Sequence, residues 1–171
     1  MLLANGRLVP CSQTLYYSYF TRSTQLEFSE NRQFRAHRSE FDVIRNFIES
    51  ACRNFPHDDL QRLILIVEEL FCNSVDHGYG GDSDQPVWLA LAPAADGCAL
   101  VYQDAAPAHD PFAADNDPML EAAVENRPVG GLGVFLIGKY CSSQRYERRG
   151  GHNVIELFVP RGRANPDAQS K

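Results

Sequence analysis

A polar stripe in an otherwise apolar segment carries the residues of this chain that are best suited to chemistry. Glu69, Asn73 and His77 recur at four-residue spacing, so on a helix they project from one side, one turn apart. An amide oxygen is a good ligand for Mg²⁺, which binds phosphate oxygens and keeps several waters. A carboxylate one turn away can accept the proton of an attacking hydroxyl. The spacing alone, however, is more typical of an ordinary solvated helix face.

Two segments further along the chain contain groups that suit a bound nucleotide. Asp104 follows a strand-like apolar run, where its carboxylate can accept a hydrogen bond from an adenine amino group; taken alone, it is more typical of a turn that ends a strand. Gly130-Gly131-Leu132-Gly133 precedes an apolar helix, and free N–H groups at a helix start attract phosphate, although a glycine hinge has the same pattern. The chain has no GxxxxGKS or GxxxxGKT sequence, which excludes the P-loop mechanism.

Composition and charge exclude several broad classes of protein. With 171 residues, 44% of them hydrophobic and 22% charged, the chain is typical of one soluble globular domain. Its net charge of −6 argues against nucleic acid as a partner. The five cysteines show no CxxC spacing, so no zinc site is predicted, and reduced buried thiols suit a reducing cytosol. We recognise neither a membrane span nor a signal peptide, and expect a cytoplasmic protein with no membrane partner.

Hydrophobic periodicity predicts the elements that would position these groups. Helices are expected over residues 37–54, from about Leu60 to His77, and over residues 132–140. Strands are expected at residues 25–28 and in two hairpins, one pairing 87–91 with 98–102 and one pairing 143–148 with 153–159. Residues 107–129 form a long polar segment of the kind that is usually a functional lid or disordered. This order predicts an α+β fold, a two-layer sandwich of a mixed, mainly antiparallel sheet with helices on one face.

Taken in order, three motifs and a closing hairpin resemble those of one known family. The motifs are Glu69-x-x-x-Asn73 followed by His77-Gly78-Tyr79, Asp104-Ala105-Ala106 followed by Asp110-Pro111, and Gly130-Gly131-Leu132-Gly133; the hairpin runs from Tyr146 to Leu157. They are similar to the N box, the adenine-binding box, the phosphate-binding glycine box and the last hairpin of the ATP-binding GHKL superfamily. More closely, the chain resembles the anti-sigma factor serine-protein kinases of bacterial partner-switching systems. The likeness covers roughly residues 25 to 160.

This resemblance implies a Bergerat-type ATP-binding fold and a role for individual residues. Glu69 would be the catalytic residue that activates a serine or threonine hydroxyl on a partner, and Asn73 would bind Mg²⁺. Asp104 would bind adenine. The implied ATP-binding residues are Asn73, His77, Asp104, Ala106, Gly130, Gly131, Leu132, Gly133 and Val134. His77 would either donate a hydrogen bond to phosphate or only cap the helix end.

The resemblance also implies a function and partners. The protein would be an ATP-dependent serine/threonine-protein kinase that phosphorylates an anti-sigma-factor antagonist and sequesters a sigma factor or similar regulator. Residues 25–160 would form the kinase domain, between an N-terminal extension of unknown role (residues 1–24) and a polar tail (residues 161–171). Family members often pair through a sheet surface, so a homodimer is compatible with this interpretation.

Two other functional classes stay open at this point. The chain has Ala106 where the family usually has glycine, and His109 where phenylalanine is usual. These departures leave room for a non-catalytic partner-binding module with a degenerate or purely regulatory ATP site. The third class is an ATPase or chaperone-like member of the superfamily, which would hydrolyse ATP at a substantial rate without a partner.

Overall fold

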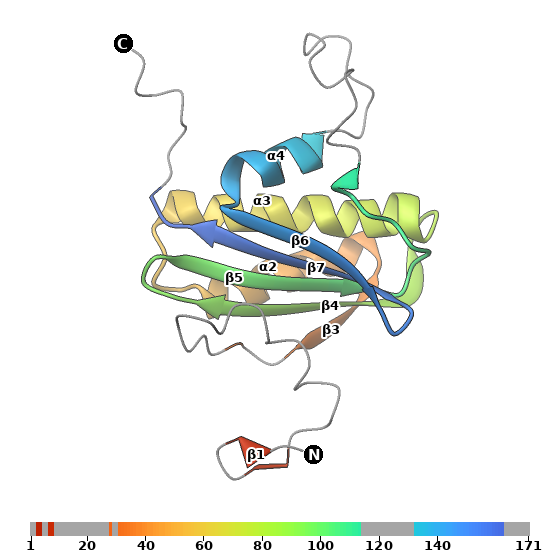
Figure 1. The fold of residues 1–171 in the computed structure, drawn as a ribbon, viewed down its shortest axis with the longest axis horizontal. Helices are drawn as coiled ribbons and strands as arrows, with labels where there is room; N and C mark the ends of the chain where they lie inside the picture. Colours follow the sequence, from red (N-terminus) through yellow and green to blue (C-terminus); the bar gives the residue numbers. More distant parts are fainter. Residues whose placement is uncertain (1–2, 5–6, 9–27, 29–30, 114–131, 163–171) are drawn as a thin grey trace, which may run out of the picture.

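The computed structural model describes residues 3–4, 7–8, 28, 31–113 and 132–162. Its main body is a five-stranded sheet with helices packed against it (Figure 1). Near the N-terminus, the two-residue strands β1 (Leu3–Ala4) and β2 (Arg7–Leu8) pair with each other in a separate antiparallel ladder. Most of the predicted lid, residues 114–129, lies outside the described residues.

The sheet is antiparallel throughout the part of the chain that the structure describes. Its strands are β3 (Arg32–Ala36), β4 (Ser83–Pro93), β5 (Gly97–Asp104), β6 (Ser143–Arg149) and β7 (His152–Pro160). They lie in the order β3-β4-β5-β7-β6, so β5 is the central strand. Both predicted hairpins are confirmed, β4 with β5 and β6 with β7. The mainly antiparallel sheet is therefore confirmed.

Three helices in the described residues lie on the sheet, and each forms near where its sequence pattern predicts. They are α2 (Phe41–Ala51), α3 (His57–Asn73) and α4 (Leu132–Tyr140), with a 3₁₀ turn at Arg38–Glu40 before α2. Apolar residues of all three share one core with alternate residues of the sheet, such as Leu89, Leu100 and Leu157. In Figure 1, α3 runs along the sheet with α4 beside it. The predicted two-layer α+β architecture is confirmed.

The first strand of the sheet is not where the sequence pattern placed it. The prediction for residues 25–28 is wrong at Phe28, which lies outside any strand, while residues 25–27 fall outside the described part of the chain. The first strand of the sheet is β3, at one edge, where Phe34 and Ala36 are buried and their neighbours in the strand are exposed. Phe28 instead packs against a small cluster of Ala90, Val101 and Val154. A four-residue alternation is too short to distinguish a strand from an apolar contact of this kind.

Candidate nucleotide site

A widened helical turn brings the end of α3 to the site. The helix continues beyond Asn73 as a π-helical turn, Ser74–Gly78, whose backbone bond runs from Tyr79 N to Ser74 O at 2.8 Å. Such turns inside helices are rare and occur frequently at functional sites. The apolar face of α3 points into the core, with Leu70 and Phe71 buried. The helix is thus anchored by packing while its last polar residues reach the pocket.

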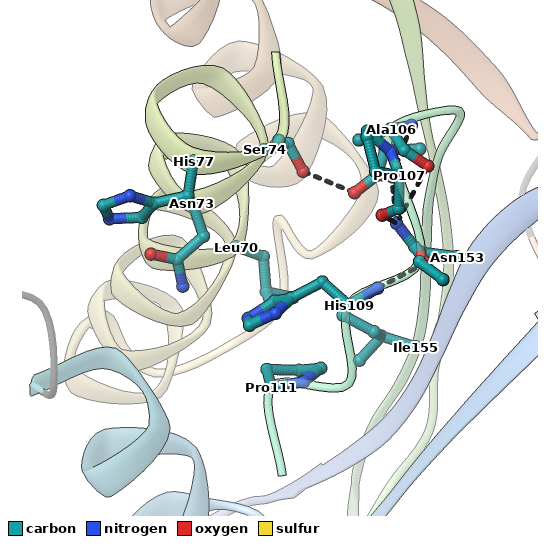
Figure 2. Close-up of a pocket in the computed structure, with 13 residues that line it drawn as sticks. Leu70, Asn73, Ser74, His77, Ala106, Pro107, His109, Pro111, Asn153 and Ile155 are labelled. Atoms are coloured by element: carbon teal, nitrogen blue, oxygen red, sulfur yellow. Dashed lines mark hydrogen bonds between the residues drawn. The ribbon is translucent and has the colours of Figure 1, made fainter. Parts of the chain in front are cut away.

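A pocket of about 220 Å³ lies between this helix end and the loop after β5. The predicted site residues Asn73, His77, Asp104 and Ala106 all line it. Figure 2 shows Asn73 and His77 on the helical side and Ala106 and His109 on the opposite side. The structure therefore brings together two motifs that are about thirty residues apart in the sequence.

Asp104, the last residue of β5, is buried and held in place by three hydrogen bonds. Its Oδ1 accepts from the backbone N–H of Ala106 at 3.0 Å and from Nδ2 of Asn153 at 2.7 Å. Its Oδ2 accepts from the hydroxyl of Ser74 at 2.7 Å. A buried carboxylate without such partners would be costly, so these donors explain how it is tolerated at the pocket wall.

Asn153 in β7 is a second buried polar residue of the pocket, and sequence reasoning gave it no role. Its Nδ2 donates to Asp104 and, at 3.0 Å, to the carbonyl of Pro107. Its Oδ1 accepts from His109 N, Tyr146 Oη and Arg148 Nη1 at 3.2, 2.9 and 2.8 Å. Arg148 also donates to the carbonyl of Ala106 at 2.7 Å. Asn153 thereby ties the loop after β5 to the last hairpin. An asparagine at the start of an apolar strand is the one sequence signal that points to it.

We expect Asn153→Ala to lower the free energy of unfolding by about 2–4 kcal/mol, because it leaves several buried donors and acceptors unpaired. Urea unfolding measures this loss. Gln144→Ala, on the neighbouring strand β6 with an exposed side chain, is the control and should change stability by less than about 0.5 kcal/mol. Equal stability of Asn153→Ala and the unmodified chain would show that the hydrogen bonds do not hold the loop.

Glu69 lies one turn before Asn73 on α3, but it does not line the pocket. Its side chain is half-buried, and this burial, together with repulsion from Glu68, raises the pKa of Glu69. A raised pKa makes a carboxylate a better proton acceptor than an ordinary surface glutamate. Because Glu69 does not line the pocket, its side chain is not placed to contact a nucleobase inside it.

The side chains present suit an Mg²⁺ ion that is held mainly by phosphate. Within the described residues, the Asn73 amide has no hydrogen-bond partner, so it is available as a ligand. The same part of the chain contains no group of three or more His, Cys, Asp or Glu side chains that would hold a metal. Mg²⁺ in nucleotide sites commonly takes one or two protein ligands and fills its shell with phosphate oxygens and water.

The predicted glycine box is only partly within the described residues. Gly130 and Gly131 lie outside them, whereas Leu132, Gly133 and Val134 form the first turn of α4. The helix predicted to follow the glycines is therefore confirmed. Phosphate binding by this segment stays a prediction.

Gly78 and Ala106 meet at the pocket. A Cβ atom built on Gly78 would lie 2.8 Å from the Cβ of Ala106, closer than real Cβ atoms approach other heavy atoms. Only glycine fits at position 78 while alanine stands at position 106. The alanine that departs from the usual family pattern is thus matched by the glycine of the π-helical turn.

Comparison with known proteins identifies one family. A family model for the histidine kinase-like ATPase domain matches residues 34–159, which is most of the chain and runs from within β3 to within β7. No curated protein matches the chain. Among the described residues, no helix is long and apolar enough to cross a membrane.

Proposed function

Since the chain belongs to the family of histidine kinase-like ATPase domains, we propose that it is an ATP- and Mg²⁺-dependent serine/threonine-protein kinase that also acts as an anti-sigma-type regulator. Family membership implies an ATP-binding domain; the kinase specificity and the partners are our inference. The observation that carries the proposal is the pocket itself. It places the firmly held carboxylate of Asp104 opposite Asn73 and His77, with Glu69 one turn away.

Each side chain has a separate task in this proposal. Asp104 accepts a hydrogen bond from the adenine amino group, and Asn73 holds the Mg²⁺ that neutralises phosphate charge. The pocket is smaller than the roughly 300–1,000 Å³ of most ligand sites, so it suits a base, with the phosphates at its mouth. His77 is exposed at that mouth and can donate a hydrogen bond to phosphate.

The transfer step needs one proton acceptor. Glu69 takes the proton of the partner's serine or threonine hydroxyl as that oxygen bonds to the γ-phosphorus. The bond between the γ-phosphorus and the bridging oxygen breaks, and ADP leaves with the bond's electron pair. The products are a phosphorylated partner, ADP and protonated Glu69, which returns its proton to water.

The proposed phosphoryl acceptor is an anti-sigma-factor antagonist, and the sequestered partner is a sigma factor or similar regulator. A homodimer and a cytoplasmic location belong to the same proposal, as does the absence of nucleic-acid and membrane partners. The net charge of −6 supports only the exclusion of nucleic acid.

We expect Mg-ATP to bind the purified chain and Asn73→Ala to weaken that binding about tenfold or more, because the ion loses its protein ligand. Calorimetric titration with and without Mg²⁺ measures both quantities. In the absence of Mg²⁺ the variant and the unmodified chain should bind ATP equally. An Asn73→Ala protein with unchanged Mg-ATP affinity would remove the metal role from this residue.

One observation favours a second function, that of a partner-binding module with a regulatory or degenerate ATP site. A Cβ on Gly78 would lie 2.8 Å from the Cβ of Ala106, so the methyl group of Ala106 occupies space at the pocket wall that a glycine would leave open. No binding at millimolar ATP, with partner binding intact, would support this module over the kinase. Rapid ATP hydrolysis without a partner would instead favour an ATPase.

A further inference from the structure

A chain of buried hydroxyl groups runs from the core of the protein to the pocket. The hydroxyl of Tyr102 donates to Ser74 Oγ at 2.9 Å, and Ser74 Oγ donates to Asp104 Oδ2 at 2.7 Å. The exposed fractions of these three residues are 1%, 4% and 6%. Water therefore cannot substitute freely for any member of the chain. Figure 2 shows the last link, from Ser74 across to the loop side of the pocket.

The direction of these hydrogen bonds follows from the chemistry of the groups. Burial raises the pKa of Tyr102 well above its usual value, so the phenol keeps its hydrogen and donates it. The oxygens of Asp104 act as acceptors toward all of their protein partners. Ser74 stands between a donor and an acceptor and has a single hydrogen. That hydrogen is committed to Asp104, so Ser74 has none to offer a ligand.

The two oxygens of Asp104 differ in how many further hydrogen bonds each can accept. From the described residues, Oδ1 accepts two hydrogen bonds, from Ala106 and Asn153, and Oδ2 accepts only one, from Ser74. A carboxylate oxygen accommodates about two donors. The remaining capacity lies on Oδ2, the oxygen that Ser74 holds. At Asp104 and Ser74 the pocket thus offers a ligand an acceptor and no hydroxyl donor.

We propose that Tyr102 and Ser74 are positioning residues that fix Asp104 so that its Oδ2 selects a nucleobase with an exocyclic amino group over one with a keto oxygen. The proposal rests on the proposed nucleotide site and deepens it. An amino group at this position donates the second hydrogen bond that Oδ2 can accept. A keto oxygen there is itself an acceptor, so Oδ2 gains no second hydrogen bond. A site built to bind a donor rejects an analogue that lacks it, because its own buried polar group is then unpaired.

The test compares the affinities of ATP and inosine triphosphate, which carries a keto oxygen in place of the adenine amino group. The unmodified chain should prefer ATP by at least about tenfold. In Ser74→Ala this preference should fall about fivefold or more, because the carboxylate loses the donor that orients it. If the unmodified chain binds neither nucleotide, the proposed function fails. If it prefers ATP and Ser74→Ala keeps that preference, only the positioning role fails.

Two further variants separate positioning from general loosening of the structure. Ser74→Ala combined with Tyr102→Phe removes the tyrosine hydroxyl that the single variant leaves without a partner, so stability should recover while base preference stays low. A double variant that regains the preference would overturn the proposal. Tyr79→Phe is the matched control, since its hydroxyl bonds Ala105 N and Pro86 O of the neighbouring backbone and touches neither Ser74 nor Asp104. It should weaken both nucleotides equally; a fall in its ATP preference as large as that in Ser74→Ala would also overturn the proposal.

Discussion

Replacing Glu69 with glutamine is expected to lower phosphoryl transfer by roughly 10²–10⁴-fold, because glutamine cannot take the proton of the attacking hydroxyl. ATP affinity should be retained, since Glu69 does not line the pocket. Transfer of labelled γ-phosphate to the partner measures the first quantity and calorimetry the second. Near-normal phosphoryl transfer by Glu69→Gln would show that Glu69 is not the proton acceptor.

The raised pKa of Glu69 adds two checks on the same variant. Transfer by the unmodified chain should fall on acidification at a pH above the ordinary glutamate pKa of about 4.3, because the base must be ionised. When the folded-state pKa of a carboxyl lies above its unfolded pKa, the protonated form favours the folded state. This contribution to stability is fully present below the unfolded pKa and is lost as the pH rises through the folded pKa. Glu69→Gln should therefore have a higher melting temperature than the unmodified chain at pH 8 and lose that advantage at pH 4.

Glu68→Gln is the matched control for both checks. It is the preceding residue, also half-buried, and it lies off the Glu69, Asn73 and His77 stripe. It should keep transfer and move the acid limb to lower pH, because repulsion from Glu68 contributes to the raised pKa of Glu69. An acid limb at the same pH in Glu68→Gln and the unmodified chain would contradict this electrostatic explanation.

Gly78→Ala is expected to weaken ATP binding about tenfold or more and to destabilise the fold by about 1–3 kcal/mol. The new methyl group would overlap that of Ala106, because the two Cβ atoms would lie only 2.8 Å apart. Relief of the overlap requires the loop after β5 to move. Such a movement breaks the bond from Ala106 N to Asp104 that helps to hold the carboxylate. Titration with ATP and urea unfolding measure the two effects.

A compensating substitution makes this prediction specific. Ala106→Gly removes the opposing methyl group, so the double variant with Gly78→Ala should recover most of the lost affinity. Gly138→Ala in α4 is the control, because a Cβ there meets no atom of the described residues within 4 Å; it should be neutral or slightly stabilising. A double variant that binds ATP as weakly as Gly78→Ala alone would show that steric overlap is not the cause of the lost affinity.

Much of the site was predictable because the local sequence pattern around its key residues indicates where each one lies on its helix or strand. Four-residue spacing identified Glu69, Asn73 and His77 as one side of a helix, and α3 with its π-helical turn presents them in that order. Asp104 was recognisable as a polar residue ending an apolar strand, and it ends β5. A pattern with the period of a helix or strand predicts that element well, because the element forms by burying one of its faces.

The supporting residues were not predictable for a physical reason. Ser74 follows the Glu69–Asn73 motif and Tyr102 lies within an apolar strand. Neither local sequence indicates that the residue belongs to a hydrogen-bond chain ending at Asp104. Asn153 is 49 residues from Asp104 in sequence, and their hydrogen bond exists only because β7 pairs with β5. The first strand was predicted at residues 25–28, and not at β3, because a four-residue alternation does not distinguish a strand from an apolar contact.

The sequence by itself determined the family-like motifs, the order of helices and hairpins, and the identity of the groups with chemical capacity. Only the tertiary structure decided which of them share a pocket, that Glu69 stands outside it, and that Gly78 must stay small. The reason is that periodic burial is a local property of the chain. Hydrogen-bond partners and close contacts between distant segments are set by strand pairing and helix packing, which no single segment encodes.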